Sequence, residues 1–289
     1  MKHLILIIST ALALSSCTGR EILFDGSSEK VPFECPAPFE GKTVNIWYNI
    51  PEGVSGRAPV QIVMHGDGRN ADGYFKAWKT FSDEKGFVLL VPEFDKEQFP
   101  QRMYHQGNVM AEDGSFNPSD DRIYKVIDAI FEYFLSHSDI KADRFNIYGH
   151  SAGGQFVHRY MMLGDTRHVA RAVAANPGWY SFPTDTAAWP YGTAGILSPE
   201  AKKEFYAKDM VVLLGQADTL RENNNLHISP EADAQGMTRL ERGTTYYNWC
   251  KADAETLGLD FNWTLEYVPG VGHSNTRMAP AAVAAIYPQ

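Results

Sequence analysis

Short apolar runs alternate along this chain with longer segments in which apolar residues recur every three or four positions. The short runs have the length of buried strands and close at Gly, Pro or Asn, whereas the longer segments have the period of amphipathic helices. The segment Thr43–Ile50 alternates with period two. The other predicted strands are Val60–Met64, Phe87–Val91, Phe145–Tyr148, Ala170–Ala174, Met210–Leu214 and Trp263–Val268.

Helical patterns lie between these strands. One has its apolar positions from Tyr74 to Phe81 and stops at Gly86, a second runs from Ile123 to Phe134, and a third runs from Thr244 to Leu257 before Gly258. A glycine directly after the last apolar position is a common helix stop. The repeated strand and helix order predicts a doubly wound, mostly parallel α/β sheet in one domain over residues 31–289, with all of these strands parallel.

The N-terminal segment has a different pattern. The apolar run Leu4–Leu14 is too short to span a bilayer as a helix and has the length of a secretory signal. It ends in Leu-Ser-Ser-Cys17, which resembles the bacterial lipobox, in which the Cys is lipidated and begins the mature chain. We expect a signal peptide over residues 1–16, a lipid on Cys17 and a polar tether over residues 17–30. The alternative is an ordinary signal with an accidental Cys.

Such a signal predicts an exported lipoprotein of the cell envelope, at the outer membrane or surface more than at the inner membrane. The 289 residues carry 26 Lys and Arg against 35 Asp and Glu, a formal charge of −9, with no basic run, which argues against a nucleic acid partner.

Besides Cys17, the chain contains two cysteines, Cys35 and Cys250. An oxidising compartment permits a disulfide between them, and the alternative is two separate buried thiols. Neither is expected to be catalytic.

The fourth predicted parallel strand leads into Gly149-His-Ser151-Ala-Gly-Gly154, and a helical segment follows from Gln155 to Leu163. A Gly-x-Ser-x-Gly motif between a strand and a helix is typical of a sharp turn that exposes a nucleophilic serine. Small flanking residues are needed because the turn leaves no space for side chains. Ser151 is therefore the predicted nucleophile.

A serine nucleophile needs a base and a third group that orients the base. Asp218 follows the strand Met210–Leu214, and His273 lies in a Gly-rich loop after the last strand. Catalytic groups of doubly wound sheets lie at the carboxyl ends of the strands, so Asp218 and His273 are predicted as the acid and the base. The alternatives are a turn carboxylate at Asp218, with Glu222 and Asp233 further from a strand end, and a surface histidine at His273.

The oxyanion formed by serine attack requires donors that are already in place. The backbone N–H of Ala152, next to the nucleophile, is one predicted donor. The second is the N–H of Asp67, in the loop Met64–Asn70 after the strand Val60–Met64. Alternatively, Asp67 and Arg69 form an ion pair that shapes this loop, and His65 is expected to be a buried hydrogen-bonding residue.

A long aromatic and proline-rich insertion, about residues 176–208, precedes the strand Met210–Leu214 and is predicted to cap the site. Trp179, Trp189 and Tyr191 are candidates for stacking on a sugar ring or a phenolic acid, and the alternative is that they pack the insertion onto the body. No metal-binding cluster or dinucleotide motif is found in the sequence, and no cofactor is expected.

These motifs together resemble the α/β-hydrolase superfamily over essentially the whole mature chain. The stretch from Asp143 to Gly154 is similar to that of the polyhydroxybutyrate depolymerase and feruloyl esterase-like group, secreted esterases that cleave polyester or plant-phenolic esters. The resemblance implies a carboxylic-ester hydrolase that works through an acyl-enzyme on carbohydrate-linked, phenolic or polyester-type esters. The loop His-Gly-Asp67 departs from the His-Gly-Cys that many members carry, which leaves the substrate open.

The sequence leaves two other functions open. The motif Gly-x-Ser-x-Gly-Gly is also similar to that of prolyl-oligopeptidase-type serine peptidases, but these place a propeller before the catalytic domain, and the chain has no room for one. The other alternative is a surface lipoprotein that binds glycan or polymer without catalysis. The presence of Ser151, Asp218 and His273 in the expected order argues against it.

The lipobox generates the first testable prediction. Cys17→Ser removes the lipidated atom, so the variant should leave the membrane fraction while the wild type stays in it. Partitioning into a detergent phase after secretion measures this. If both proteins remain in the aqueous phase, the resemblance to a lipobox is accidental.

Overall fold

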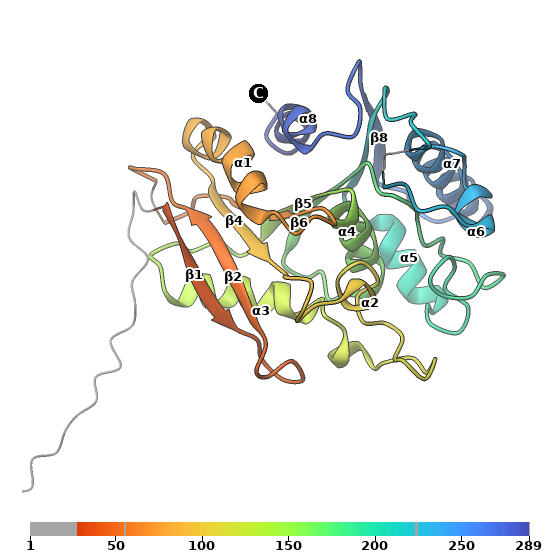
Figure 1. Cartoon of the computed structure of the whole chain (residues 1–289), viewed down its shortest axis with the longest axis horizontal. Helices are drawn as coiled ribbons and strands as arrows, with labels where there is room; N and C mark the ends of the chain where they lie inside the picture. The colour runs from red at the N-terminus through yellow and green to blue at the C-terminus, as the bar shows by residue number, and fades with distance from the viewer. Residues whose placement is uncertain (1–27, 55, 223–224, 289) are drawn as a thin grey trace, which may run out of the picture.

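An eight-stranded sheet forms the centre of the molecule, in a computed structural model that describes residues 28–54, 56–222 and 225–288 (Figure 1). The strand order across the sheet is β1-β2-β4-β3-β5-β6-β7-β8. The strands are β1 (Ser28–Glu34), β2 (Thr43–Asn49), β3 (Val60–Met64), β4 (Val88–Glu93), β5 (Phe145–His150), β6 (Val169–Ala175), β7 (Met210–Gly215) and β8 (Trp263–Val268). The predicted α/β class and every predicted strand are confirmed, with ends that agree to within two residues.

The direction predicted for Thr43–Ile50 is wrong. Strands β3 to β8 are parallel to one another, but β2 runs antiparallel to both β1 and β4. Parallel neighbours need a long crossover, whereas only a short turn joins β1 to β2. The period-two pattern of this segment was itself a sign of an antiparallel strand with one less buried face.

Strand β1 is missing from the sequence-based prediction and begins at Ser28, inside the segment predicted to be a tether. Only Val31 and Phe33 of this edge strand are buried, which is too little for a clear pattern. The predicted signal peptide, Cys17 and the tether up to residue 27 lie outside the described residues. In the part of the chain that is described, no helix is both long and apolar enough to cross a bilayer.

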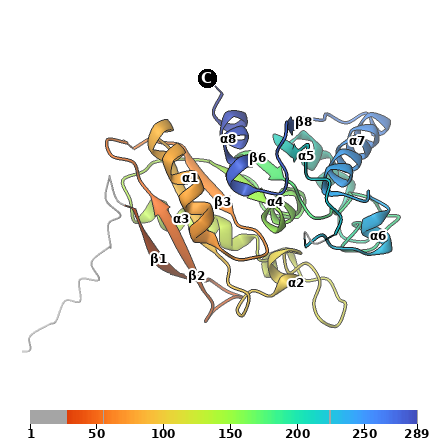
Figure 2. The same ribbon diagram turned by 45° about the horizontal axis from the view of Figure 1, so that its top comes forward.

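Helices cover both faces of the sheet (Figures 1 and 2). Helices α1 (Ala71–Lys85) and α8 (Asn275–Ile286) pack side by side on one face. The opposite face carries α3 (Lys125–Ser136), α4 (Ala152–Leu163), α5 (Pro199–Ala207) and α7 (Arg239–Leu257). The one-turn helices α2 (Gln101–Tyr104) and α6 (Pro230–Asp233) and the 3-10 turn Ser119–Asp121 lie in the connections.

Glycines end two of the predicted helices as expected. Gly86 after α1 and Gly258 after α7 have left-handed backbones, with φ of 70° and 64°. Helix α7, however, begins at Arg239 and not at Thr244, because Thr238 caps it. Its first turns place Arg239 and Arg242 on the buried face, where a hydrophobic pattern cannot reveal them.

The two cysteines lie in separate parts of the core. Cys35 follows the edge strand β1, whereas Cys250 is in α7, which packs on β7 toward the other edge. Both thiols are buried and free, so the disulfide considered from the sequence does not form. Burial raises the pKa of the Cys35 thiol to about 12, which keeps it protonated and unreactive.

Candidate active site

The carboxyl ends of β5, β7 and β8 bring the three predicted catalytic side chains together. Ser151 Oγ lies 2.9 Å from His273 Nε2, and His273 Nδ1 lies 2.7 Å from Asp218 Oδ2. In this arrangement His273 Nδ1 donates to the carboxylate and Nε2 accepts from the serine hydroxyl. The geometry is that of a hydroxyl next to a base that a carboxylate orients.

The turn from β5 into α4 holds Ser151 in a backbone conformation that L-residues rarely adopt, with φ of 60° and ψ of −117°. Its N–H donates to the carbonyl of Ala175 at 2.9 Å, which fixes the turn to the end of β6. A Cβ at Gly149 would meet the backbone of Gly153, and a Cβ at Gly153 would meet the carbonyl of Met64. The glycines therefore allow the close approach that presents Ser151 at the end of the sheet.

Asp218 is fully buried, and α7 supplies a cation beside it. Arg239 Nη1 lies 3.6 Å from Asp218 Oδ1, which is an ion pair beyond hydrogen-bonding distance. The two carboxylate oxygens thus face His273 and Arg239 respectively. A buried carboxylate is tolerated only with such partners. Sequence reasoning missed Arg239, because a buried arginine on the inner side of a helix does not contribute to a hydrophobic pattern.

Asn176 joins the ends of β6 and β7 next to the hydrogen-bonded residues Ser151, His273 and Asp218. Its Oδ1 accepts from the N–H of Gly215 at 2.8 Å, and its own N–H donates to the carbonyl of Leu213 at 3.1 Å. Like Ser151, it has a positive φ, here 44°. The end of β6 is thereby joined to the end of β7, from which Asp218 follows.

The loop after β3 carries the second predicted oxyanion donor. Asp67 and Ala152 both line the pocket, and no hydrogen bond within the described residues uses either backbone N–H. The Asp67–Arg69 ion pair considered as an alternative does not form. Asp67 pairs with His105 Nε2 at 3.1 Å and with Lys96 Nζ at 3.5 Å. Arg69 instead donates to the carbonyl of Phe94 at 2.6 Å.

His65 holds this loop in place, as expected for a buried hydrogen-bonding residue. Its Nε2 accepts from the N–H of Phe94 at 3.0 Å, its Nδ1 donates to the carbonyl of Gly66 at 3.0 Å, and its ring stacks on Tyr104. Burial lowers the pKa of His65 from 6.5 to about 3. The imidazole is therefore neutral at physiological pH, which matches its role as acceptor.

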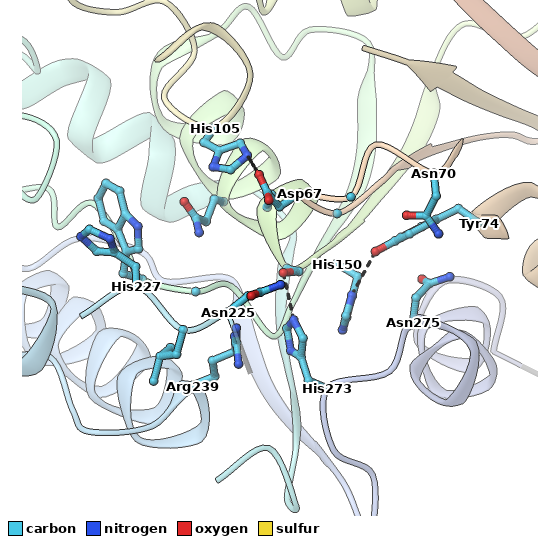
Figure 3. Close-up of a pocket in the computed structure, with 18 of the residues that line it drawn as sticks. Asp67, Asn70, Tyr74, His105, His150, Asn225, His227, Arg239, His273 and Asn275 are labelled. Carbon is cyan, nitrogen blue, oxygen red and sulfur yellow. Dashed lines mark hydrogen bonds and ion pairs between the residues drawn. The ribbon is translucent and has the colours of Figure 1, made fainter. Parts of the chain in front are cut away.

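The pocket in front of Ser151 has a volume of about 740 Å³ and a polar lining. Figure 3 shows His105 and Asp67 on one side of it, Asn70 and Asn275 on another, and His227 and Arg239 on a third. Carboxamide side chains recur around the wall, from Asn70, Gln101, Gln155, Asn225 and Asn275. Such groups offer both N–H donors and carbonyl acceptors to a substrate with several polar atoms.

The predicted aromatic residues contribute less surface than expected. Trp179 lines the pocket but is only 3% exposed, and Trp189 is 5% exposed and does not line it. Tyr191 lies behind Trp179, with ring centroids 4.6 Å apart, and its hydroxyl lies 2.9 Å from His227 Nε2. Little ring face is left for a sugar or a phenolic acid to stack on, and the packing alternative fits these rings better.

Comparison with known proteins gives similarity at the level of structure. No family model and no curated protein matches the chain. The structure of poly(aspartic acid) hydrolase-1 from Sphingomonas sp. KT-1 matches with a TM-score of 0.85 and 35% identity, over 90% of this chain and 98% of that chain. The poly(3-hydroxybutyrate) depolymerase LpqC from Bordetella parapertussis matches with a TM-score of 0.87 and 28% identity, over 91% and 89%.

A more distant match shares the fold alone. The fluorophosphonate-binding serine hydrolase F from Staphylococcus aureus has a TM-score of 0.56 and 14% identity, over 91% of this chain and 98% of that chain.

The neutral, buried state of His65 predicts how stability depends on pH. Because the folded pKa lies below the ordinary value of 6.5, the unfolded chain binds a proton that the folded chain does not bind as the pH falls from about 6.5 to about 3. The free energy of unfolding should therefore decrease over this window. The contribution of His65 is at most about 1.4 kcal/mol per pH unit.

Urea unfolding of the wild type and of His65→Gln at several pH values measures this contribution. The variant should be less stable at neutral pH, because its loop loses hydrogen bonds, but its stability should fall less steeply between about pH 6 and pH 4. Equal slopes in the two proteins would show that His65 takes up a proton in the folded state.

Proposed function

For this chain, which belongs to the α/β-hydrolase superfamily and is an ester-hydrolysing serine hydrolase, we propose that Ser151, His273 and Asp218 cleave the ester bonds of an oligomeric or polymeric substrate. The observation that carries the proposal is the hydrogen-bonded series from Ser151 Oγ through His273 to Asp218, at the wall of a polar pocket. No other residues are needed for the covalent steps.

The reaction follows from this arrangement. Ser151 Oγ attacks the ester carbonyl as His273 Nε2 takes its proton, and Asp218 stabilises the imidazolium. The N–H groups of Ala152 and Asp67 are proposed to bind the oxyanion. Collapse of the tetrahedral intermediate expels the alcohol, which receives the proton from His273, and leaves an acyl-enzyme on Ser151. A water molecule, deprotonated by His273, then attacks the acyl carbonyl and releases the acid.

A polyester-type substrate fits the pocket better than a phenolic or carbohydrate-linked ester. A chain of ester units presents carbonyl oxygens at regular intervals, and the carboxamides around the pocket provide N–H donors for them. Trp179 and Trp189 offer little surface for an aromatic or sugar ring. The similarity to a poly(3-hydroxybutyrate) depolymerase at 28% identity supports the same substrate class.

Hydrolysis of amide bonds in a poly(aspartic acid)-type polymer is the second candidate. It is favoured by the 35% identity with poly(aspartic acid) hydrolase-1 over 98% of that chain. The same serine, histidine and aspartate serve for both reactions, but an amine leaving group must be protonated by His273 before the bond breaks.

We also propose that the enzyme acts outside the cytoplasm as a lipoprotein of the cell envelope, anchored through Cys17. The support is the sequence Leu-Ser-Ser-Cys17 after an apolar run of signal-peptide length. A polymer too large to be imported is best degraded at that location.

Substitution of the three catalytic side chains tests the mechanism. A fluorophosphonate should label the wild type on Ser151 and should not label Ser151→Ala. His273→Ala should lower kcat about as much as Ser151→Ala, roughly 10⁴- to 10⁶-fold, whereas Asp218→Asn should retain more activity. Glu222→Gln, which removes an exposed carboxylate near the same loop, is the control and should keep wild-type kcat. Labelling that persists in Ser151→Ala would contradict the assignment of the nucleophile.

A substrate panel distinguishes the two candidate reactions. Purified protein is incubated with 3-hydroxybutyrate oligomers, poly(aspartic acid), a feruloyl ester and an acetylated sugar, and products are measured by chromatography. The polyester proposal predicts the highest kcat/KM for the 3-hydroxybutyrate oligomers. Faster release of aspartate oligomers would favour the amide reaction. Faster cleavage of the feruloyl ester would contradict the proposal that the pocket prefers a polyester-type substrate to a phenolic ester.

A further inference from the structure

A buried arginine lies directly behind the pocket wall. Arg159 of α4 has no exposed surface, and it contacts three residues that line the pocket. Its Nη1 donates to the carbonyl of His105 at 2.5 Å and to Gln155 Oε1 at 3.2 Å, and its guanidinium lies 4.1 Å from the centre of the Trp179 ring. A further bond runs from Nε to Ser181 Oγ at 2.8 Å.

The charge of Arg159 has no anionic partner among the described residues. No carboxylate in that part of the chain lies within 4.0 Å of its guanidinium, and the buried Nη2 atom has no hydrogen-bond partner. The two buried arginines of α7 differ in this respect. Arg239 lies 3.6 Å from Asp218, and Arg242 lies 3.0 Å from Asp233. Burial of an unpaired charge is unfavourable, so a counter-charge is expected when the protein binds its ligand.

Gln155 connects this cation to the pocket. Because Arg159 donates to Oε1, the amide is oriented and Nε2 is its remaining donor. Nε2 lies beside Gly178, another lining residue, and no hydrogen bond between described residues engages it. Gln155 stands four residues after Ser151, about 6 Å further along α4. A group bound there is a few bonds from the ester carbonyl that Ser151 attacks.

The charged residues that line the pocket, Asp67 and Arg239, already have partners of opposite charge. Asp67 pairs with His105 and Lys96, and Asp218 pairs with Arg239 and His273. His227 forms a hydrogen bond with the Tyr191 hydroxyl. Its pKa is lowered by burial and by the nearby charge of Arg242, which favours the neutral imidazole. The positive charge of Arg159, which contacts the pocket lining and has no anionic partner among the described residues, is therefore the one that a bound anion would balance.

We propose that Gln155 Nε2, supported by Arg159, forms a subsite for a carboxylate of the substrate. This inference rests on the proposed ester hydrolysis and names the substrate more closely, as an ester whose chain carries a free carboxylate a few bonds from the cleaved bond. An anionic oxygen accepts a stronger hydrogen bond than a neutral carbonyl, and donation from Arg159 polarises the amide further. The carboxylate is either a chain end of a hydroxy-acid oligomer or a side group of a polymer.

Matched pairs of small esters test the subsite. Monomethyl glutarate carries the carboxylate on the acyl side and 3-acetoxybutyrate carries it on the alcohol side, and each is compared with its neutral carboxamide. In at least one pair, the wild type should show a kcat/KM about tenfold higher for the carboxylate. The pair that shows the preference identifies whether the site accepts a carboxylate on the acyl side or on the alcohol side of the cleaved ester. The chain end of a hydroxy-acid oligomer lies on the alcohol side. Ratios near one in both pairs would overturn the proposal.

Two substitutions at Gln155 locate the effect. The measured quantity is the ratio of kcat/KM for the carboxylate to kcat/KM for the matched carboxamide. Gln155→Glu places a carboxylate beside Arg159, so this ratio should fall below one. Gln155→Leu removes the Nε2 donor, so the ratio should approach one. Gln101→Glu is the matched control, because it adds the same charge to the same pocket without a contact to Arg159, and it should lower the ratio less.

The outcomes separate this proposal from the proposed function. Equal decreases in Gln155→Glu and Gln101→Glu would show a general effect of pocket charge and would contradict the subsite. Thermal unfolding and fluorophosphonate labelling confirm that each variant is folded with an accessible serine. Failure of the wild type to hydrolyse any of the four compounds, or to be labelled, would count against ester hydrolysis itself.

Discussion

The close packing of the β5–α4 turn against the ends of β3 and β6 is the constraint on which the rest of the structure depends. Ser151 keeps a positive φ because Gly149 and Gly153 let the backbone segments touch and because its N–H is bonded to Ala175. The cost of this conformation is offset by the surrounding sheet. With the turn fixed, the serine hydroxyl and the N-terminus of α4 face the loops that follow β7 and β8, where His273 and Asp218 lie.

Buried cations then shape the space around this turn. Arg239 lies beside Asp218, and Arg242 donates to the carbonyls of Gly178 and His227. Helix α7 therefore contacts both the catalytic aspartate and one wall of the pocket. Arg159 of α4 packs on the Trp179 ring and orients Gln155. The same chain segments that stabilise the fold thus determine which polar groups reach the substrate. A core that contains paired and unpaired charges is less stable than an apolar one, and it provides binding groups in return.

Much of this could be predicted from the sequence, for physical reasons. Buried parallel strands are continuous apolar runs, and the order Ser151, Asp218, His273 at their ends reflects how such a sheet is wound. Strand β1 was missed because only two of its residues are buried, and the start of α7 was missed because arginines occupy its inner face. The length and the aromatic, proline-rich composition of the insertion predict a cap or binding loop, whereas Trp179 and Trp189 are buried against Arg159. Charged residues inside a protein cannot be located from periodicity, since their partners come from distant parts of the chain.

Direct detection of the acyl-enzyme tests the central claim. The protein is mixed with p-nitrophenyl acetate, stopped with acid within milliseconds and digested, and the peptides are analysed by mass spectrometry. The account predicts that one acetyl group is attached to Ser151 while p-nitrophenol is released in a burst. Turnover of the ester with no acetyl group on Ser151, or with the group on another residue, would contradict it.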